Sequence, residues 1–303
     1  MKDEFKTFCE AIRLTESQEQ DAKTKYDGVC KKLHDSYYTN SYTGSTKLLF
    51  GSYKTRTNIR PLSEDQDVDV LFKIPEETFK KFHKYQSNGQ SALLQEIRYF
   101  LNEKYSTTEE IRAWGKVVLV KFSEGVHNVE VLPGYEQCDG SFMIPNTANG
   151  GSWERFDLKQ QLKRFQDSNC RTNSLTAELT RMLKKWVRNT SSLDYSSFNL
   201  QQDVMKFLDS EFLIGAKYEE YHKVIMNFFD YLRYRCPSSI KTHVDTAYSR
   251  AVKAIEFMDN DKLVEASEEW IKIFGSEFPK VKENPEKKSD ARIFYNPSSP
   301  WSR

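Results

Sequence analysis

The segment FGS at residues 50–52, followed by DVDVLF at residues 67–72, decides the fold expected of this chain. In a β-strand, residues i and i+2 point to the same face, so Asp67 and Asp69 would project side by side while the valines enter a core. Two neighbouring carboxylates repel each other unless a cation lies between them. The Gly-Ser pair offers backbone N–H groups and a hydroxyl to a phosphate. Together these features predict a nucleotide and Mg²⁺ site.

Each of these signals is weak by itself. An Asp-x-Asp pattern is common at strand edges and turns, and a Gly-Ser pair is more common still. The order of the elements is more specific, because an apolar run, Gly-Ser, a polar loop and an aspartate-bearing strand follow one another. That order favours the active site of a nucleotidyltransferase.

Length and composition exclude several classes of protein. The 303 residues are enough for one large or two ordinary domains, and a net charge of +1 provides no overall field toward nucleic acid or membrane. The five cysteines form no Cys-x-x-Cys pair, which argues against a disulfide framework or a zinc ribbon. The chain has no apolar run long enough to span a membrane and no signal-peptide core, which predicts a cytoplasmic protein.

The first half of the chain mixes helices and strands. Thr15 reads as the N-cap of a long helix, and a second helix is expected at residues 91–105. A buried strand is expected at residues 68–74. Two further strands, at residues 116–122 and 126–132, are expected to form a hairpin.

Glu130 lies in the second strand of that hairpin, on the face opposite to Val129 and Val131. A carboxylate in so apolar a strand is expensive to bury without a partner. Taken alone, it is best explained as a glutamate on the wet face of a sheet edge. Beside two aspartates, it fits the third carboxylate that two-metal phosphoryl transfer needs on a neighbouring strand.

The second half of the chain is expected to be helical. The loop signal at residues 146–152 places a domain boundary just after it. The expected domains are residues 1–155, residues 156–280 and a mobile charged and Pro/Ser-rich tail at residues 281–303.

One helix of the second half combines an apolar face with basic side chains. Arg181 and Lys184 are spaced i and i+3, so they could act as one phosphate clamp or form the solvated edge of an amphipathic helix. Its apolar residues recur at helical spacing, as expected of a packed face: Leu175, Leu179, Met182, Leu183 and Trp186.

These motifs in combination resemble the polymerase-β-like nucleotidyltransferase superfamily. The resemblance rests on FGS and DVDV, on GSYKTRTNIRPL at residues 51–62 and on VEVLP at residues 129–133. The segments RMLKKW at residues 181–186 and SF at residues 197–198 are similar to the branch with oligoadenylate synthase, cyclic GMP–AMP synthase and the bacterial cyclic oligonucleotide synthases (CD-NTases). The segment WIKIFGSEFP at residues 270–279 is similar to bacterial members from the anti-phage systems called CBASS.

The resemblance implies an α/β plus α fold, in which a two-lobed polymerase-β-like core sheet and a helical C-terminal lobe surround a central cleft. It implies that nucleoside triphosphates, ATP among them, are joined into a cyclic di- or trinucleotide second messenger that acts on a separate effector. It implies two Mg²⁺ or Mn²⁺ ions per active site. The implied catalytic and metal-binding residues are Asp67, Asp69 and Glu130, and the implied nucleotide-binding residues are Gly51, Ser52, Arg181, Lys184, Ser197 and Phe198.

Two other functions stay open at this point. A related enzyme could make linear oligonucleotides or modify RNA or protein, although the balanced charge argues against a strong nucleic-acid surface. An inactive nucleotide-binding scaffold is the second alternative, against which the intact Gly-Ser pair and the three carboxylates argue. The bases, the ring size, the linkage and the need for a regulatory partner protein are not decided by the sequence.

Overall fold

The computed structural model describes residues 1–63, 66–122, 127–211 and 213–282. The chain divides into two compact units, each described here by itself. The smaller unit contains Met1–Phe8, Asn189–Leu193 and the segment from Lys217 onward; the larger unit contains Cys9–Arg188 and Asp194–Ala216. These units are defined by their internal contacts, and the division expected between residues 155 and 156 stays a prediction.

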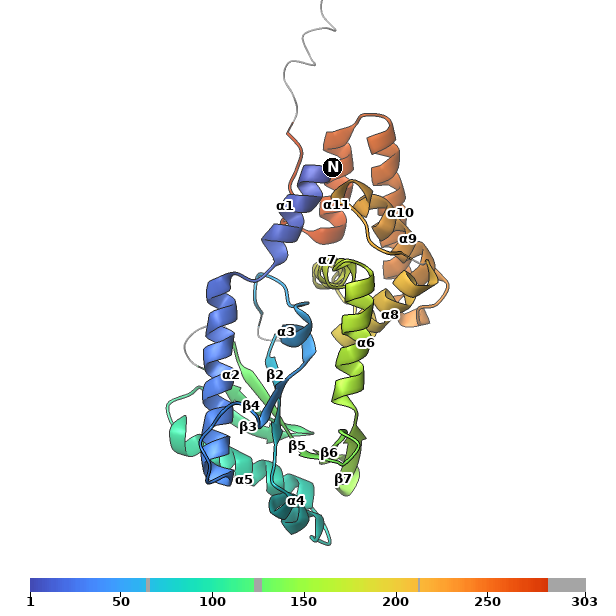
Figure 1. The fold of residues 1–303 in the computed structure, drawn as a ribbon. Helices are drawn as coiled ribbons and strands as arrows, with labels where there is room; N and C mark the ends of the chain where they lie inside the picture. Colours follow the sequence, from blue (N-terminus) through green and yellow to red (C-terminus); the bar gives the residue numbers. More distant parts are fainter. Residues whose placement is uncertain (64–65, 123–126, 212, 283–303) are drawn as a thin grey trace, which may run out of the picture. The chain divides into compact units, whose positions relative to one another are not determined.

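A mixed β-sheet forms the centre of the larger unit (Figure 1). Its strand order is β1-β2-β5-β4-β3, and β6 and β7 extend it from β5. Strands β2 and β5 run parallel, whereas all other pairs are antiparallel. The strands are β1 (Lys47–Leu49), β2 (Val68–Lys73), β3 (Glu110–Trp114), β4 (Val117–Lys121), β5 (Val129–Glu136), β6 (Phe142–Asn146) and β7 (Ser152–Phe156).

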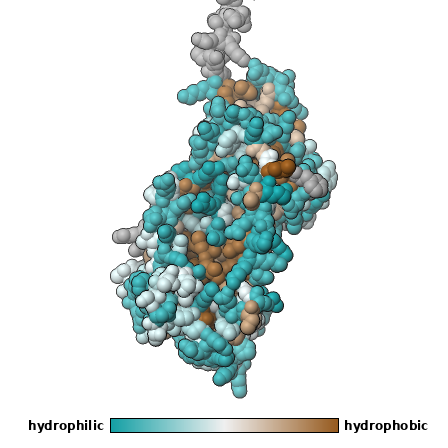
Figure 2. All heavy atoms as spheres, in the orientation of Figure 1, coloured by the Kyte–Doolittle hydropathy of each residue, from teal (hydrophilic) through white to brown (hydrophobic). Residues whose placement is uncertain are grey.

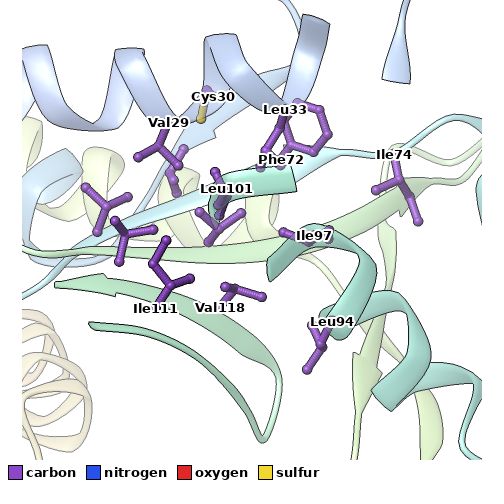
Figure 3. Packing of buried hydrophobic residues seen from close by; sticks show 14 of the residues in the cluster. Val29, Cys30, Leu33, Phe72, Ile74, Leu94, Ile97, Leu101, Ile111 and Val118 are labelled. Carbon is purple, nitrogen blue, oxygen red and sulfur yellow. The ribbon is translucent and has the colours of Figure 1, made fainter. Parts of the chain in front are cut away.

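Helices α2 and α5 cover one face of this sheet (Figures 1 and 3). Figure 3 shows Leu33 of α2, Phe72 of β2 and Ile97 of α5 in the resulting core, and all three side chains are fully buried. The helices of the larger unit are the end of α1 (Lys2–Ile12), α2 (Glu16–Tyr37), α3 (Gly51–Thr55), α4 (Glu76–His83), α5 (Gly89–Lys104), α6 (Leu158–Arg171), nearly all of α7 (Leu175–Asn189) and α8 (Ser197–Ser210).

The surface of the larger unit is mostly hydrophilic on the face shown in Figure 2. Apolar side chains gather there at the level of α3 and β2 (Figure 2). In the part of the chain that the structure describes, no helix combines the length and the apolar character needed to cross a bilayer.

The smaller unit is helical, with α9 (Tyr221–Arg233), α10 (Ser238–Asp259) and α11 (Leu263–Phe274) packed around aromatic side chains. Phe5 of α1 lies edge-on to Trp270, with ring centroids 5.3 Å apart, and to Phe278 at 5.1 Å. The aromatic residues of the segment 270–279 therefore form part of a core that also holds the N-terminal helix.

Several elements expected from the sequence are confirmed. Thr15 caps α2 in a full capping box with Gln18. The strands expected at residues 68–74 and 116–122 are β2 and β4, and β4 pairs antiparallel with β5. The helical second half is present as α6 to α11.

Other details differ from the expectation. Strand β5 continues through Pro133 and Gly134 because its parallel partner β2 continues beside it. Strand β3 was not predicted, since of its five residues only Ile111 is buried and the alternation is weak. The connection between the two strands of the expected hairpin, the first residue of the strand expected at 126–132 and most of the expected tail lie outside the described residues.

Candidate active site

The three predicted carboxylates meet at the parallel pair β2–β5. Asp69 of β2 and Glu130 of β5 are register partners, so their side chains are neighbours on one face of the sheet, and Asp67 directly precedes β2. The alternate residues Val68 and Val70 are fully buried in the core. The alternation of the strand therefore separates an apolar face from a carboxylate face, as the sequence predicts.

The carboxylates oppose one another's ionisation. Burial raises the pKa of Asp69 to about 7, and the neighbouring charges of Glu130 and Asp67 add to this effect. Burial also raises the pKa of Glu130, with a further contribution from Asp67, while Arg112 acts in the opposite direction. A hard divalent cation would relieve this repulsion, because carboxylate oxygens are its preferred ligands.

The carboxylates are neighbours in the sheet rather than a finished ligand shell. Among the described residues, no three or more His, Cys, Asp or Glu side chains are arranged so that they could hold one metal ion by themselves. A divalent ion at such a site shares its remaining coordination positions with substrate phosphates and water. The donor set fits a metal that binds together with a nucleotide.

Gly51 packs directly against Asp69. Its φ is +61°, and a Cβ atom built on it would lie 1.9 Å from Asp69 Oδ2. The preceding backbone N–H, that of Phe50, donates to the Asp69 carbonyl oxygen at 3.1 Å. A residue without a side chain is therefore required where α3 begins, because it lets Ser52 and the α3 backbone approach the carboxylates.

One face of α7 presents three basic side chains to the loop that follows α3. They recur at i, i+3 and i+7, which places them on one side of the helix. Arg181 Nη1 donates to the Arg56 carbonyl at 2.6 Å, Lys184 Nζ lies 3.5 Å from Thr57 Oγ1, and Arg188 donates to the Pro61 carbonyl and to Ser63 Oγ. This face of α7 fastens the loop at residues 56–63.

Lys184 also belongs to the carboxylate site. Its side chain is half-buried, and this burial lowers its pKa to about 8, while the nearby charge of Asp69 acts in the opposite direction. The half-buried Lys184, near the half-buried Asp69, supplies positive charge where phosphates would bind. Arg181, in contrast, makes its contacts with the Arg56 carbonyl and with Glu178, 3.7 Å away.

Ser197 and Phe198 open helix α8. The hydroxyl of Ser196 accepts a hydrogen bond from the backbone N–H of Asn199 and caps the helix. Both Ser197 and Phe198 are exposed, and the Phe198 ring is 53% exposed. An aromatic ring left in solvent at a helix start is available to stack on a base.

In the structure, Gly51, Glu130 and Lys184 thus lie near Asp69. Arg181 binds the loop at residues 56–63. Ser197 and Phe198 lie on the surface of the same unit. Sequence reasoning missed Arg188, although its spacing from Arg181 and Lys184 was a usable signal. It also missed Thr57, whose buried hydroxyl carries no sequence pattern.

Comparison with known families supports this site. The model of the Second Messenger Oligonucleotide or Dinucleotide Synthetase domain (SMODS) matches residues 1–169. The chain belongs to this family. This SMODS protein is therefore a nucleotidyltransferase of the cyclic oligonucleotide synthase type, which confirms the family and activity expected from the sequence.

Individual relatives are distant but span nearly the whole chain. A probable cyclic nucleotide synthase of Bacillus cereus strain VD146 is 21% identical over 319 residues, covering 86% of this SMODS chain and 94% of the relative. Vibrio cholerae DncV cyclic AMP-GMP synthase, solved with a linear intermediate, has a TM-score of 0.69 at 12% identity, over 89% of this chain and 93% of DncV. Escherichia coli MS115-1 CdnC, solved with a HORMA protein, has a TM-score of 0.64 at 17% identity, over 91% and 98%. These likenesses confirm the predicted polymerase-β-like fold with its helical lobe.

Gly51→Ala should abolish oligonucleotide synthesis while leaving the protein folded. The new methyl group would lie 1.9 Å from Asp69 Oδ2, inside van der Waals contact, and would displace that carboxylate. Turnover should fall by about a hundredfold or more, the loss typical of a misplaced catalytic charge.

Gly115→Ala is the matched control, because Gly115 has a similar φ of +57° but nothing within 4 Å of its added Cβ. Both variants carry the same backbone strain, so equal losses of turnover would show that strain, and not the contact with Asp69, is responsible.

Asp69→Asn should stabilise the metal-free protein at pH 8. Because the folded-state pKa of Asp69 is about 7 and its ordinary value is 3.8, the folded protein between about pH 4 and pH 7 holds a proton there that the unfolded chain has already released. Stability is therefore lost as the pH rises through this window. A shift of about three pKa units corresponds to roughly 4 kcal/mol, so the variant should gain up to about 4 kcal/mol in unfolding free energy at pH 8 and less than about 1 kcal/mol at pH 4.

Urea unfolding in the presence of EDTA at the two pH values measures this difference. Asp35→Asn is the control, since Asp35 forms a surface ion pair with Lys31 and its removal should bring no gain. An equal effect of Asp69→Asn at both pH values would contradict the assignment of a buried, ionising Asp69.

Proposed function

We propose that Asp67, Asp69 and Glu130 bind two divalent metal ions, Mg²⁺ or Mn²⁺, and that this SMODS protein uses the site to join nucleoside triphosphates into a cyclic di- or trinucleotide. The observation that carries the proposal is the pairing of Asp69 with Glu130 across two parallel strands beside Asp67, with the pKa values of both paired groups raised. Such a carboxylate face is stable in its charged form only with a cation.

When bound, the metal ions would lower the pKa of the acceptor hydroxyl and neutralise the charge on the transferred phosphate and on the departing pyrophosphate. The protein's own residues position the reactants. The three carboxylates supply oxygen ligands, and Gly51 and Ser52 leave room for the donor triphosphate against them. Lys184 adds positive charge beside the phosphates.

The remaining nucleotide contacts are assigned to the helical part of the chain. In this proposal, residues 1–155 carry the catalytic sheet and residues 156–280 complete the nucleotide cleft, followed by a tail at 281–303. Phe198 stacks on a base, and Ser197 donates to a phosphate. Arg181 reaches the phosphates after it releases the Arg56 carbonyl.

Complexes of structural relatives support the substrates and a partner. DncV was solved with the linear intermediate 5′-pppA(3′,5′)pG, and CdnC was solved with ATP and in complex with a HORMA protein. By analogy, we assign ATP among the substrates of this SMODS protein, a regulatory partner protein and a separate effector for the product in CBASS anti-phage signalling. The location in the cytoplasm stays a prediction.

The double variant Asp67→Asn, Asp69→Asn should lose about a hundredfold or more in product formation from the four NTPs with Mg²⁺ or Mn²⁺. Mass spectrometry before and after phosphatase treatment identifies the product, because a cyclic oligonucleotide has no terminal phosphate to lose. Asp35→Asn, Asp167→Asn removes the same charge from two exposed surface pairs and should keep full activity. Undiminished product from the first variant would refute the site, and a phosphatase-sensitive product would refute cyclisation.

Metal affinity should weaken as the pH falls. A carboxylate must lose its proton before it binds a metal, and the pKa of Asp69 is about 7. The apparent dissociation constant for Mn²⁺ should therefore rise about tenfold between pH 8 and pH 6. Calorimetric titration of the metal-free protein measures it, and an affinity that is constant over this range would exclude Asp69 as a ligand.

A further inference from the structure

A second cavity lies in the larger unit, away from the catalytic carboxylates. Its volume is about 630 Å³, within the range typical of small-molecule sites. Its walls come from the start of α2 and the two residues after α1, the end of α3 and the residues after it, one face of α6 and the first half of α7. Among the described residues, Asp67, Asp69 and Glu130 are not part of its lining.

The lining is basic. Four cationic side chains, Arg13, Lys54, Arg56 and Arg181, face a single carboxylate, that of Glu19. Arg13 and Arg181 both pair with the buried Glu178. Lys54 and Arg56 are exposed, and no carboxylate of the described residues forms an ion pair with them. These two side chains are available to an anion at the rim of the cavity.

The interior of the cavity suits a planar polar group. Phe165 and Ala177 are buried and form an apolar floor. Asn169 is held in the wall because its Oδ1 accepts a hydrogen bond from the Ala177 N–H at 2.9 Å. Asn58 is 6% exposed, and its amide nitrogen, beside the Tyr53 hydroxyl, makes no hydrogen bond of ordinary geometry in the described part of the chain. A buried N–H group without a hydrogen-bond acceptor is unfavourable, so a ligand atom that accepts a hydrogen bond from Asn58 would stabilise the complex.

We propose that this cavity binds a nucleoside phosphate at a second site, which shares Arg181 with the proposed catalytic cleft but not its carboxylates. The phosphate would lie on Lys54 and Arg56, and the base would lie on the Phe165 floor within reach of the wall amides. Inorganic phosphate alone would leave the apolar floor unused. A polynucleotide would need a basic surface longer than this single recess.

Cys170 provides a reporter for this site, because it lines the cavity and its thiol is exposed. Replacing Cys138 and Cys236 with Ser leaves Cys170 as the one cysteine that is not buried, since Cys9 and Cys30 are both buried. In that full-length protein, the rate of Cys170 alkylation by N-ethylmaleimide, a neutral reagent, is measured with and without 5′-AMP, 5′-GMP, 5′-CMP or 5′-UMP. Monophosphates lack the pyrophosphate leaving group, so the catalytic site cannot consume them as donors.

At least one monophosphate should slow the alkylation about fivefold or more at saturation. Lys54→Glu, Arg56→Glu should remove this protection, and the milder Gln166→Glu, an exposed change in the lining, should weaken it. Lys84→Glu, Lys223→Glu makes the same change of net charge at exposed positions elsewhere and should keep the protection. Each rate is compared with and without nucleotide in the same variant, and thermal unfolding checks that each variant is folded.

The proposal is overturned if none of the four monophosphates protects Cys170 or if protection survives in Lys54→Glu, Arg56→Glu. Equal protection by inorganic phosphate would also overturn it, because the base would then contribute nothing. Protection by a single-stranded oligonucleotide but by no monophosphate would show a nucleic-acid surface instead. Because the readout is thiol chemistry at Cys170, it does not depend on turnover at the carboxylate site.

Discussion

The repulsion between Asp69 and Glu130 is the constraint on which the rest of the active site depends. The two side chains are paired across the parallel strands β2 and β5, and burial in the sheet raises the pKa of each. The fold keeps them together because the other face of the same strands is a fully buried apolar core. The stability of that core offsets the unfavourable placement of the carboxylates, as is common at functional sites.

The local part of this arrangement could be predicted from the sequence. The i, i+2 alternation of residues 67–70 fixes which face is polar, and the Thr15 capping box fixes where α2 begins. The pairing of Asp69 with Glu130 could be expected only from the need of two-metal phosphoryl transfer for a third carboxylate. The register between strands that are distant in the sequence leaves no local sequence pattern. Why Gly51 must be glycine was also hidden, since the reason is a contact with Asp69 and not only its positive φ.

Helix α7 shows the same limit. Its apolar stripe was predicted and is buried, but periodicity cannot say what its basic face contacts. In the structure, Arg181 and Arg188 bind carbonyl oxygens of the loop after α3, and Lys184, between them, lies beside Thr57 and is influenced by the charge of Asp69. Arg181 also lines the second cavity. One helix face therefore lines the cavity, holds the loop and places positive charge near Asp69.

Lys184 and Asp69 explain why the site can accept metal and nucleotide together. In the absence of both, the pKa of Asp69 is about 7 and that of Lys184 is about 8, so burial weakens the charge of each group near neutral pH. A bound cation would favour the charged carboxylate and release its proton, whereas bound phosphates would favour the charged ammonium and take up a proton. Each ligand restores the charge of a different protein group. Metal and triphosphate binding should therefore reinforce each other with little net change in bound protons. Asp69 and Lys184 are then both fully charged only when both ligands are bound.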